Sequence, residues 1–235
     1  PSGSRRSLPT VTDAGRRCGS ERLSATCVAE EGEDGGDAAV PGFGPYSPAT
    51  FVVDEDNTDG HPRADDTDWL HVELPVPDGD GTGYVQASDV SVTCHTYRIT
   101  VNRDAFTLTV TNAGESIFEA EVGLGSDERA TEEGNYFITD LAQPTDPNGG
   151  YGPYAYAFNS YSEDPDVIAE FANDEGRAQA GIHGTNQPDS VGAAESSGCI
   201  RLKNEDIGAL AADEEYMAEG VEGIGLPLGT PVDVI

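Results

Sequence analysis

Fold and chemistry both follow from one segment, which reads Gly181-Ile-His-Gly-Thr-Asn186 and, after a polar loop, Ser196-Ser-Gly-Cys-Ile-Arg-Leu-Lys-Asn204. It places a histidine and a cysteine beside two short apolar runs. A cysteine attacks carbonyl groups as a thiolate, and a nearby imidazole can take the thiol proton and later return it to a leaving amine. The pattern therefore indicates nucleophilic catalysis by Cys199, with His183 as its base.

The residues around the cysteine fit the same chemistry. Gly198 lets the backbone approach a reacting carbonyl, and the amides of Ser197, Gly198 and Cys199 could bind the oxyanion that forms. The alternatives are an inert buried thiol and a structural histidine. Zinc would need a denser cluster of ligands than this chain offers, because the remaining histidines are scattered at His61, His71 and His95. We therefore expect no metal and no cofactor.

The segment His183-Gly184-Thr185-Asn186, with Ser196-Ser197-Gly198-Cys199-Ile200-Arg201-Leu202 and Asn204, resembles the signature of the L,D-transpeptidases, which share a YkuD-type catalytic domain. The family normally has histidine at the position of Ser197. Two further segments are similar to the family: Thr131-Glu-Glu-Gly-Asn-Tyr-Phe137, with Glu132 in place of the usual proline, and the closing Gly229-Thr-Pro-Val232. The resemblance runs from about Tyr97 to Ile235.

The resemblance implies a role for each of these residues. Cys199 is the expected nucleophile and His183 the general base and then acid, with its ring oriented by the backbone carbonyl of Gly184. Ser196 supports the loop through its hydroxyl, and the Ser197 and Gly198 amides join the oxyanion site.

Arg201 and Tyr154 are the expected substrate-binding residues. Arg201 could bind a substrate carboxylate or lower the pKa of the thiol, and a structural salt bridge is the alternative. Tyr154 and Tyr151 belong to a Gly- and Pro-rich connection over residues 145–154, which could line a cleft or form a surface turn.

The reaction implied by the resemblance is peptidoglycan cross-linking. Cys199 attacks the carbonyl of the penultimate residue of a tetrapeptide stem, D-alanine leaves, and the acyl group passes to a side-chain amine of a neighbouring stem. Water as acceptor would make the protein an L,D-carboxypeptidase, and a protein lysine would make it an anchoring enzyme. A catalytically decayed wall-binding protein is the alternative from another class. The resemblance also implies acylation by carbapenem-type β-lactams.

Composition limits the partners. The chain has 44 acidic and 12 basic residues among 235, a net charge of -32. Binding to nucleic acid or to anionic membranes needs clustered Lys and Arg, so neither is expected. Such charge repels itself unless salt screens it, which favours a salt-loving source; an acidic bias of the whole proteome, with acidic tails, is the alternative. No run of about 20 apolar residues exists, so no membrane span is expected.

Four cysteines bear on the compartment. With Cys199 as the nucleophile, a Cys18–Cys27 bridge would leave Cys94 over; the alternative is that all are free thiols. Because the implied substrate is the cell wall, we expect an extracytoplasmic protein, secreted or wall-associated, whose signal segment is not in this sequence.

The chain divides into three regions. Residues 1–41 lack a hydrophobic period and predict a flexible acidic tail, and residues 42–94 resemble a small SH3-like barrel. Residues 95–235 predict a mainly β, sandwich-type L,D-transpeptidase domain with one or two short helices. Period-two alternation and turn signals predict strands at 51–53, 69–76, 83–87, 97–102, 105–110, 117–124, 155–158, 167–171 and 229–235, and a helix from Glu205 to about Met217 capped by Asn204.

Overall fold

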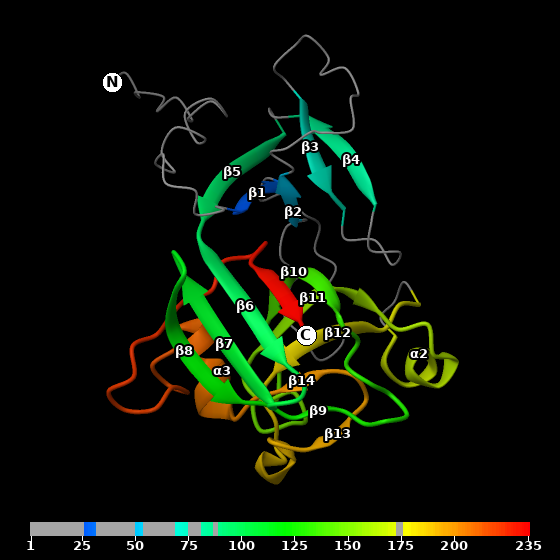
Figure 1. The fold of residues 1–235 in the computed structure, drawn as a ribbon, viewed down its shortest axis with the longest axis vertical. Helices are drawn as coiled ribbons and strands as arrows, with labels where there is room; N and C mark the ends of the chain where they lie inside the picture. Colours follow the sequence, from blue (N-terminus) through cyan, green and yellow to red (C-terminus); the bar gives the residue numbers. More distant parts are fainter. Residues whose placement is uncertain (1–25, 32–49, 54–68, 75–80, 87–88, 173–175) are drawn as a thin grey trace.

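The computed structural model describes residues 26–31, 50–53, 69–74, 81–86, 89–172 and 176–235. Most of them form an eight-stranded sheet, a five-stranded sheet and a two-stranded sheet, with two short α-helices. In the view of Figure 1 the five-stranded sheet lies above the eight-stranded one. The prediction of a mainly β protein with one or two short helices is confirmed.

The eight-stranded sheet carries the candidate site. Its order is β14-β12-β11-β10-β15-β6-β7-β8. The strands are β6 (Tyr97–Asn102), β7 (Thr107–Asn112), β8 (Glu115–Glu121), β10 (Gly134–Ala142), β11 (Ala155–Tyr161), β12 (Gln179–His183), β14 (Ile200–Arg201) and β15 (Pro231–Val234). The two-stranded sheet pairs β9 (Leu124–Gly125) with β13 (Ala194–Ser196).

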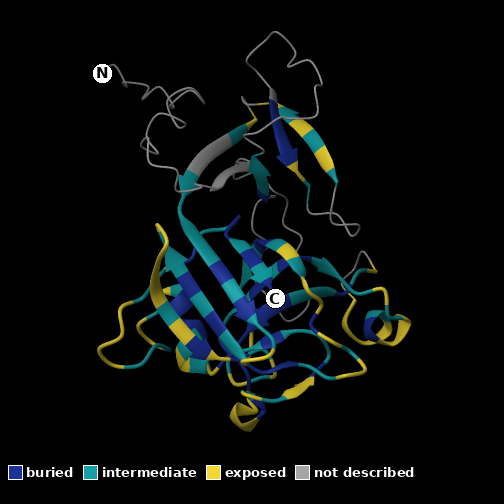
Figure 2. Ribbon diagram, viewed as in Figure 1, coloured by how far each residue is buried: buried dark blue, intermediate teal, exposed yellow. Residues whose placement is uncertain are grey.

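Alternation of apolar and polar residues explains why the strands form where they do. In β6, Ile99 and Val101 are fully buried, and in β7 Leu108 and Val110 are as well, while the residues between them face outward. Figure 2 shows these buried positions running along the strands. Such a pattern fixes the register, because a slip by one residue would expose the whole apolar face.

The long strand β10 bends the sheet. Its first half pairs with β15, its second half pairs with β11, and the register shifts between Ile138 and Asp140. A bulge of this kind bends a strand and increases its twist, so the sheet curls. The curled sheet encloses one core, in which Tyr156 and Phe158 are the largest fully buried side chains.

The five-stranded sheet has the order β4-β3-β2-β1-β5 and is antiparallel. Its strands are β1 (Thr26–Glu31), β2 (Thr50–Val53), β3 (Trp69–Glu73), β4 (Thr82–Gln86) and β5 (Val90–His95). One correction follows: β1 lies inside the region predicted as a tail. The resemblance to an SH3-like barrel stays a prediction.

Cys94 lies in β5 and is disulfide-bonded. The prediction that Cys94 is left over is therefore wrong, as is the alternative in which every cysteine is free. In the ladder between β1 and β5, Cys27 is the residue directly opposite Cys94. Cys18 lies outside the described residues, so the Cys18–Cys27 bridge stays a prediction. Cys199 is a free thiol.

Residues 167–171, predicted as a strand, belong instead to the helix α2 (Pro165–Phe171). The Asp164 side chain accepts a hydrogen bond from the Asp166 amide, and Pro165 occupies the first turn, where its missing N–H costs nothing. These capping signals outweigh the apolar run that follows them.

The helix α3 (Asn204–Ala211) is shorter than predicted and begins after Lys203. It ends at Ala212, which adopts the left-handed conformation (φ 57°) and donates its amide to the carbonyls of Gly208 and Ala209. Beyond the helix the chain turns back, and Tyr216 packs on Gly208. A β-carbon added to Gly208 would lie 2.7 Å from Tyr216 Cβ. Among the described residues, no helix is long and apolar enough to cross a membrane.

Candidate active site

Parallel pairing of β12 with β14 brings the histidine and the cysteine together. Ile182 lies opposite Ile200, and His183 lies opposite Arg201. Because side chains alternate along a strand, the two isoleucines enter the core on one face, where both are fully buried. His183 and Arg201 point to the other face, and so does Cys199, which comes directly before β14.

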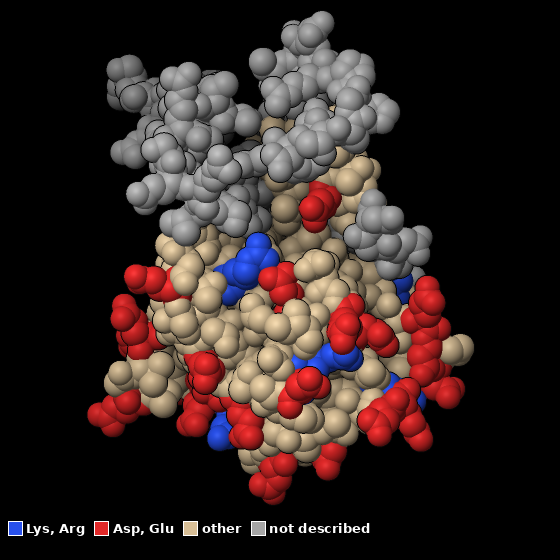
Figure 3. Space-filling model, viewed as in Figure 1, with Lys and Arg blue, Asp and Glu red and all other residues tan. Residues whose placement is uncertain are grey.

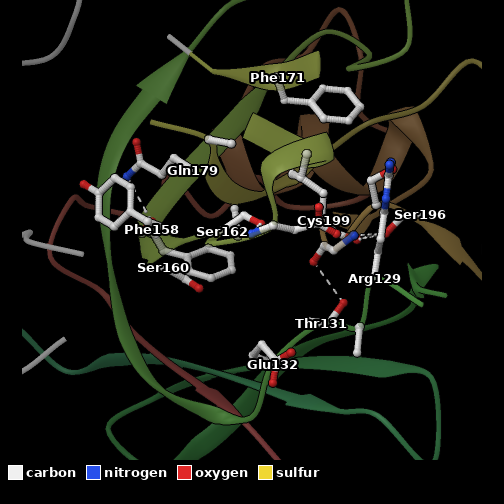
Figure 4. A pocket seen from close by; sticks show the side chains of 18 of the residues that line it. Arg129, Thr131, Glu132, Phe158, Ser160, Ser162, Phe171, Gln179, Ser196 and Cys199 are labelled. Carbon is white, nitrogen blue, oxygen red and sulfur yellow. Dashed lines mark hydrogen bonds between the residues drawn. The ribbon is translucent and has the colours of Figure 1, made fainter. Parts of the chain in front are cut away.

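This face opens into a cavity of about 830 Å³. Strands β10, β11 and β12 contribute to its lining, together with α2, the connection before β10 and the segment Ser196–Cys199. Figure 4 shows Arg129, Thr131 and Ser196 beside Cys199, with Phe158, Ser160 and Gln179 on the opposite side in that view. The cavity is thus lined by aromatic and polar side chains around one thiol.

His183 is held in a defined orientation. Its Nδ1 lies 2.5 Å from the carbonyl oxygen of Gly184, and the ring lies 4.8 Å from that of Tyr151, measured between centroids. A carbonyl only accepts, so Nδ1 carries the proton and Nε2 has the free lone pair. Burial lowers the pKa of His183 to about 4, assisted by the charge of Arg201 and opposed by the Gly184 hydrogen bond. The ring is therefore neutral at pH 7.

Cys199 is partly exposed and lines the same cavity. Burial raises the pKa of its thiol, while the Gly181 backbone and the charge of Arg201 act in the opposite direction. Thiol and imidazole are therefore both neutral at rest. Such a pair is suited to transfer a proton during attack rather than before it.

Two hydroxyl groups fix the backbone before the thiol. Ser196 Oγ donates to the Cys199 carbonyl at 2.6 Å and accepts from the Gly198 amide at 3.2 Å. Thr131 Oγ1 donates to the Gly198 carbonyl at 3.0 Å and accepts from the Gly125 amide at 2.9 Å. Gly198 itself has φ 109°, which side-chain-bearing residues rarely adopt. The Gly198 amide is therefore already engaged. The sequence did not predict the role of Thr131, because the segment 131–137 shows only a resemblance to the family and not which backbone groups the hydroxyl reaches.

The site is also supported from behind His183. Asn204 Oδ1 accepts from the Thr185 amide at 2.8 Å, so this side chain, expected to cap α3, instead holds the histidine loop. A β-carbon on Gly152 would lie 2.4 Å from Asn204 Oδ1 and 2.6 Å from Gly184 Cα. The connection that carries Tyr151 is thus packed directly on the loop that orients His183.

Arg201 lines the cavity and forms no ion pair with a carboxylate among the described residues. Its Nη1 donates to Gln187 Oε1 at 3.4 Å, and its buried Nε has no hydrogen-bond partner there. The salt-bridge alternative for Arg201 is therefore not found in the part of the chain that the structure describes.

Tyr154 lies outside the cavity lining, contrary to its expected role in substrate binding. Its hydroxyl donates to Asp213 Oδ2 at 2.5 Å, and its ring meets that of Tyr216 edge-on at 6.1 Å. Burial, followed by the Asp213 hydrogen bond, raises the pKa of Tyr154 to about 12. Tyr151, three residues earlier, lines the cavity instead.

A family comparison agrees with this arrangement. Residues 96–234 match the family model of the L,D-transpeptidase catalytic domain, YkuD. The match covers more than half of the 235 residues, so the chain belongs to the L,D-transpeptidase catalytic domain family.

Individual relatives are more distant. Two curated proteins, named as candidate L,D-transpeptidases YkuD, are 29% identical in Bacillus subtilis and 30% identical in Bacillus licheniformis, each over 116 residues and 49% of this chain. The matched region spans 59% of the length of these relatives. A solved structure of the L,D-transpeptidase LdtMt1 in complex with imipenem is 17% identical, covers 84% of this chain and 100% of that one, and has a TM-score of 0.45.

Proposed function

We propose that this protein is a peptidoglycan L,D-transpeptidase that forms cross-links through an acyl-enzyme on Cys199. The observation that supports the proposal most directly is a neutral imidazole, with Nε2 free to accept a proton, lining the same cavity as the only free thiol among the described cysteines. Family membership supports a substrate from peptidoglycan, and the proposal takes it to be the stem peptide.

The acylation step follows from these groups. Cys199 Sγ attacks the carbonyl carbon of the penultimate stem residue while its proton moves to Nε2 of His183. The tetrahedral oxyanion then collapses, the C–N bond breaks, and the leaving amine of D-alanine takes the proton from the imidazolium. A thioester remains on Cys199.

Backbone amides supply the oxyanion site in this scheme. Because the Gly198 amide donates to Ser196 Oγ, the amides of Ser197 and Cys199 are the better donors to the developing charge. Arg201 adds a positive charge that favours both thiolate and oxyanion, and its guanidinium binds the carboxylate of the leaving residue.

Deacylation is the reverse proton transfer with a new nucleophile. The side-chain amine of a diamino acid on a second stem attacks the thioester, and His183 accepts its proton. The C–S bond then breaks, and the Cys199 thiolate takes the proton back from the imidazolium. Water in place of the amine would give L,D-carboxypeptidase activity from the same acyl-enzyme.

The test is acylation by a carbapenem-type β-lactam, followed by mass spectrometry of the intact protein. We expect a single adduct on Cys199, absent from Cys199→Ala, and turnover of a tetrapeptide stem by the wild type alone. A folded protein that stays unmodified and releases no D-alanine would refute the proposal. Binding of the stem without turnover by either form would favour the decayed wall-binding protein, whose supporting feature is Ser197 at the usual histidine position.

We further propose that the protein works outside the cytoplasm, secreted or associated with the wall. The disulfide at Cys94 supports this location, because disulfides persist in oxidising compartments.

A further inference from the structure

Arg129 is a cavity-lining residue to which the mechanism above gives no task. It lies in the connection between β9 and β10, and its side chain is 28% exposed. Its Nη1 donates to Ser197 Oγ at 3.2 Å and to Glu170 Oε2 at 3.3 Å. Figure 4 shows Arg129 on the same side of the cavity as Cys199 and Ser196. A guanidinium is thus held next to the nucleophile by groups from two other segments.

Most donors of the Arg129 guanidinium have no acceptor in the described part of the chain. Arginine has five N–H groups, and the described residues accept hydrogen bonds from Nη1 alone. Glu170 lies near the end of α2 with its side chain 58% exposed, and its contact with Arg129 is single rather than bidentate. Exposed pairs of this kind contribute little to stability, so a better-placed carboxylate would displace Glu170.

The charges around the cavity show what kind of ligand would need Arg129. Of the described arginines, Arg98 and Arg103 pair with Asp233 and Glu133 and are not part of the cavity lining. Arg177 lies over the ring of Tyr161, 5.3 Å from its centroid, and does not line the cavity either. Arg129 and Arg201 both line it, together with four acidic residues, Glu128, Glu132, Glu163 and Asp164. Those carboxylates repel an anionic ligand, so such a ligand needs a guanidinium that lines the cavity, and Arg129 provides one beside Ser196 and Cys199.

We propose that Arg129 binds a second carboxylate of the stem peptide, distinct from the one bound by Arg201, and that Glu170 occupies this position in the free protein. This inference rests on the proposed function. Arginine is suited to the task because its planar fork binds a carboxylate bidentately. Ser197 takes part by offering a short hydroxyl acceptor, so the departure from the family's usual histidine coincides with the contact that positions Arg129.

The experiment measures stem-peptide binding without turnover, in the full chain carrying Cys199→Ala. Each carboxylate of the tetrapeptide is converted to its amide in turn. The Kd of each peptide is then measured for the protein that retains Arg129 and for the protein that also carries Arg129→Ala. We expect one particular amidation to weaken binding about tenfold when Arg129 is present and to have no further effect in Arg129→Ala. Arg98→Ala removes the same charge outside the cavity and should leave every Kd unchanged.

Glu170→Gln tests the competing contact. It should tighten binding of the free-acid peptide about two- to threefold and leave the peptide amidated at the Arg129 position unchanged. Weaker binding in Glu170→Gln would show that Glu170 supports the site rather than competes for it and would overturn that part of the proposal.

Two results would overturn the role of Arg129: an equal loss of affinity for every peptide in Arg129→Ala, or no loss for any of them. Failure of the proposed function has a different signature, because it removes the carbapenem adduct on Cys199 in the wild-type protein. An adduct that forms normally while Arg129→Ala fails to discriminate among the peptides would reject the Arg129 inference alone.

Discussion

The imidazole of His183 donates through Nδ1 to the carbonyl oxygen of the next residue, Gly184, at 2.5 Å. This contact fixes the tautomer with its lone pair on Nε2 and works against the effect of burial on the ring's pKa, without cancelling it. The adjacent residue therefore sets the orientation of the imidazole, whereas burial is the main influence on its base strength.

The first prediction concerns the pH dependence of acylation. His183 accepts a proton only when neutral, and its pKa of about 4 keeps it neutral well below the ordinary imidazole range. The rate of Cys199 acylation by a carbapenem should stay constant between about pH 7.5 and 6, where a base of ordinary pKa, about 6.5, would lose most of its activity. A limb centred near pH 6.5 in the mass-spectrometric rate profile would contradict the assignment.

The same shift predicts the pH dependence of stability. The pKa of His183 is lower in the folded than in the unfolded chain, so the unfolded chain binds more protons between the two values. The free energy of unfolding should be fully retained above about pH 6.5 and fall as the pH drops toward 4. Denaturant titrations of the wild type and His183→Gln should show a steeper acid loss in the wild type; parallel curves would speak against a neutral buried ring.

The close packing behind His183 gives the third prediction. Gly152→Ala would place a β-carbon 2.4 Å from Asn204 Oδ1 at φ +64°, so we expect a loss of about 2–4 kcal/mol in stability and slower acylation. Gly220→Ala is the control, because Gly220 has φ +83° and nothing within 4 Å of its would-be β-carbon. That control should cost only about 1 kcal/mol and leave acylation intact. Equal effects of the two substitutions would mean that backbone strain, not packing, limits this position.

The fourth prediction concerns Thr131. Thr131→Val keeps the shape but removes the hydrogen bonds with the Gly198 carbonyl and the Gly125 amide. We expect a loss of about 2 kcal/mol in stability and a roughly tenfold slower acylation, since the Gly198 backbone leads directly into the nucleophile. The control is Thr109→Val in β7, whose strand lies outside the cavity lining. An unchanged acylation rate in Thr131→Val would remove Thr131 from the site.

The sequence was most informative where one short-range rule governs the outcome. Alternation predicted residues 97–102 with the bounds of β6, because a half-buried strand needs nothing beyond its own pattern. The same rule predicted a strand at residues 167–171, and that prediction is wrong. The N-cap at Asp164 and the proline at position 165 favour the helix α2 there.

Contacts between distant segments could not be predicted from local sequence patterns. The position of Asn204 before a helical segment predicted an N-cap. Its side chain instead accepts a hydrogen bond from the Thr185 amide, across the site. Arg129 lies in an irregular connection with no periodic pattern, so only the fold brings it to Ser197. Tyr151 and Tyr154 share one Gly-rich connection, and the sequence offered no basis for deciding which of the two enters the cavity.

The last prediction concerns salt. Figure 3 shows Asp and Glu side chains spread over the face in view, with few Lys or Arg among them. The net charge of -32 makes the compact state repel itself, and at 1 M salt the Debye length falls to about 3 Å, shorter than most distances between surface charges. If the protein is adapted to a salt-rich environment, its Tm should rise steadily between about 0.05 and 1 M NaCl. Sucrose added without salt controls for general stabilisation by cosolutes, which acts through exclusion from the surface rather than through charge. A Tm that does not change with NaCl would defeat the salt-adaptation hypothesis and leave an acidic compositional bias as the better account.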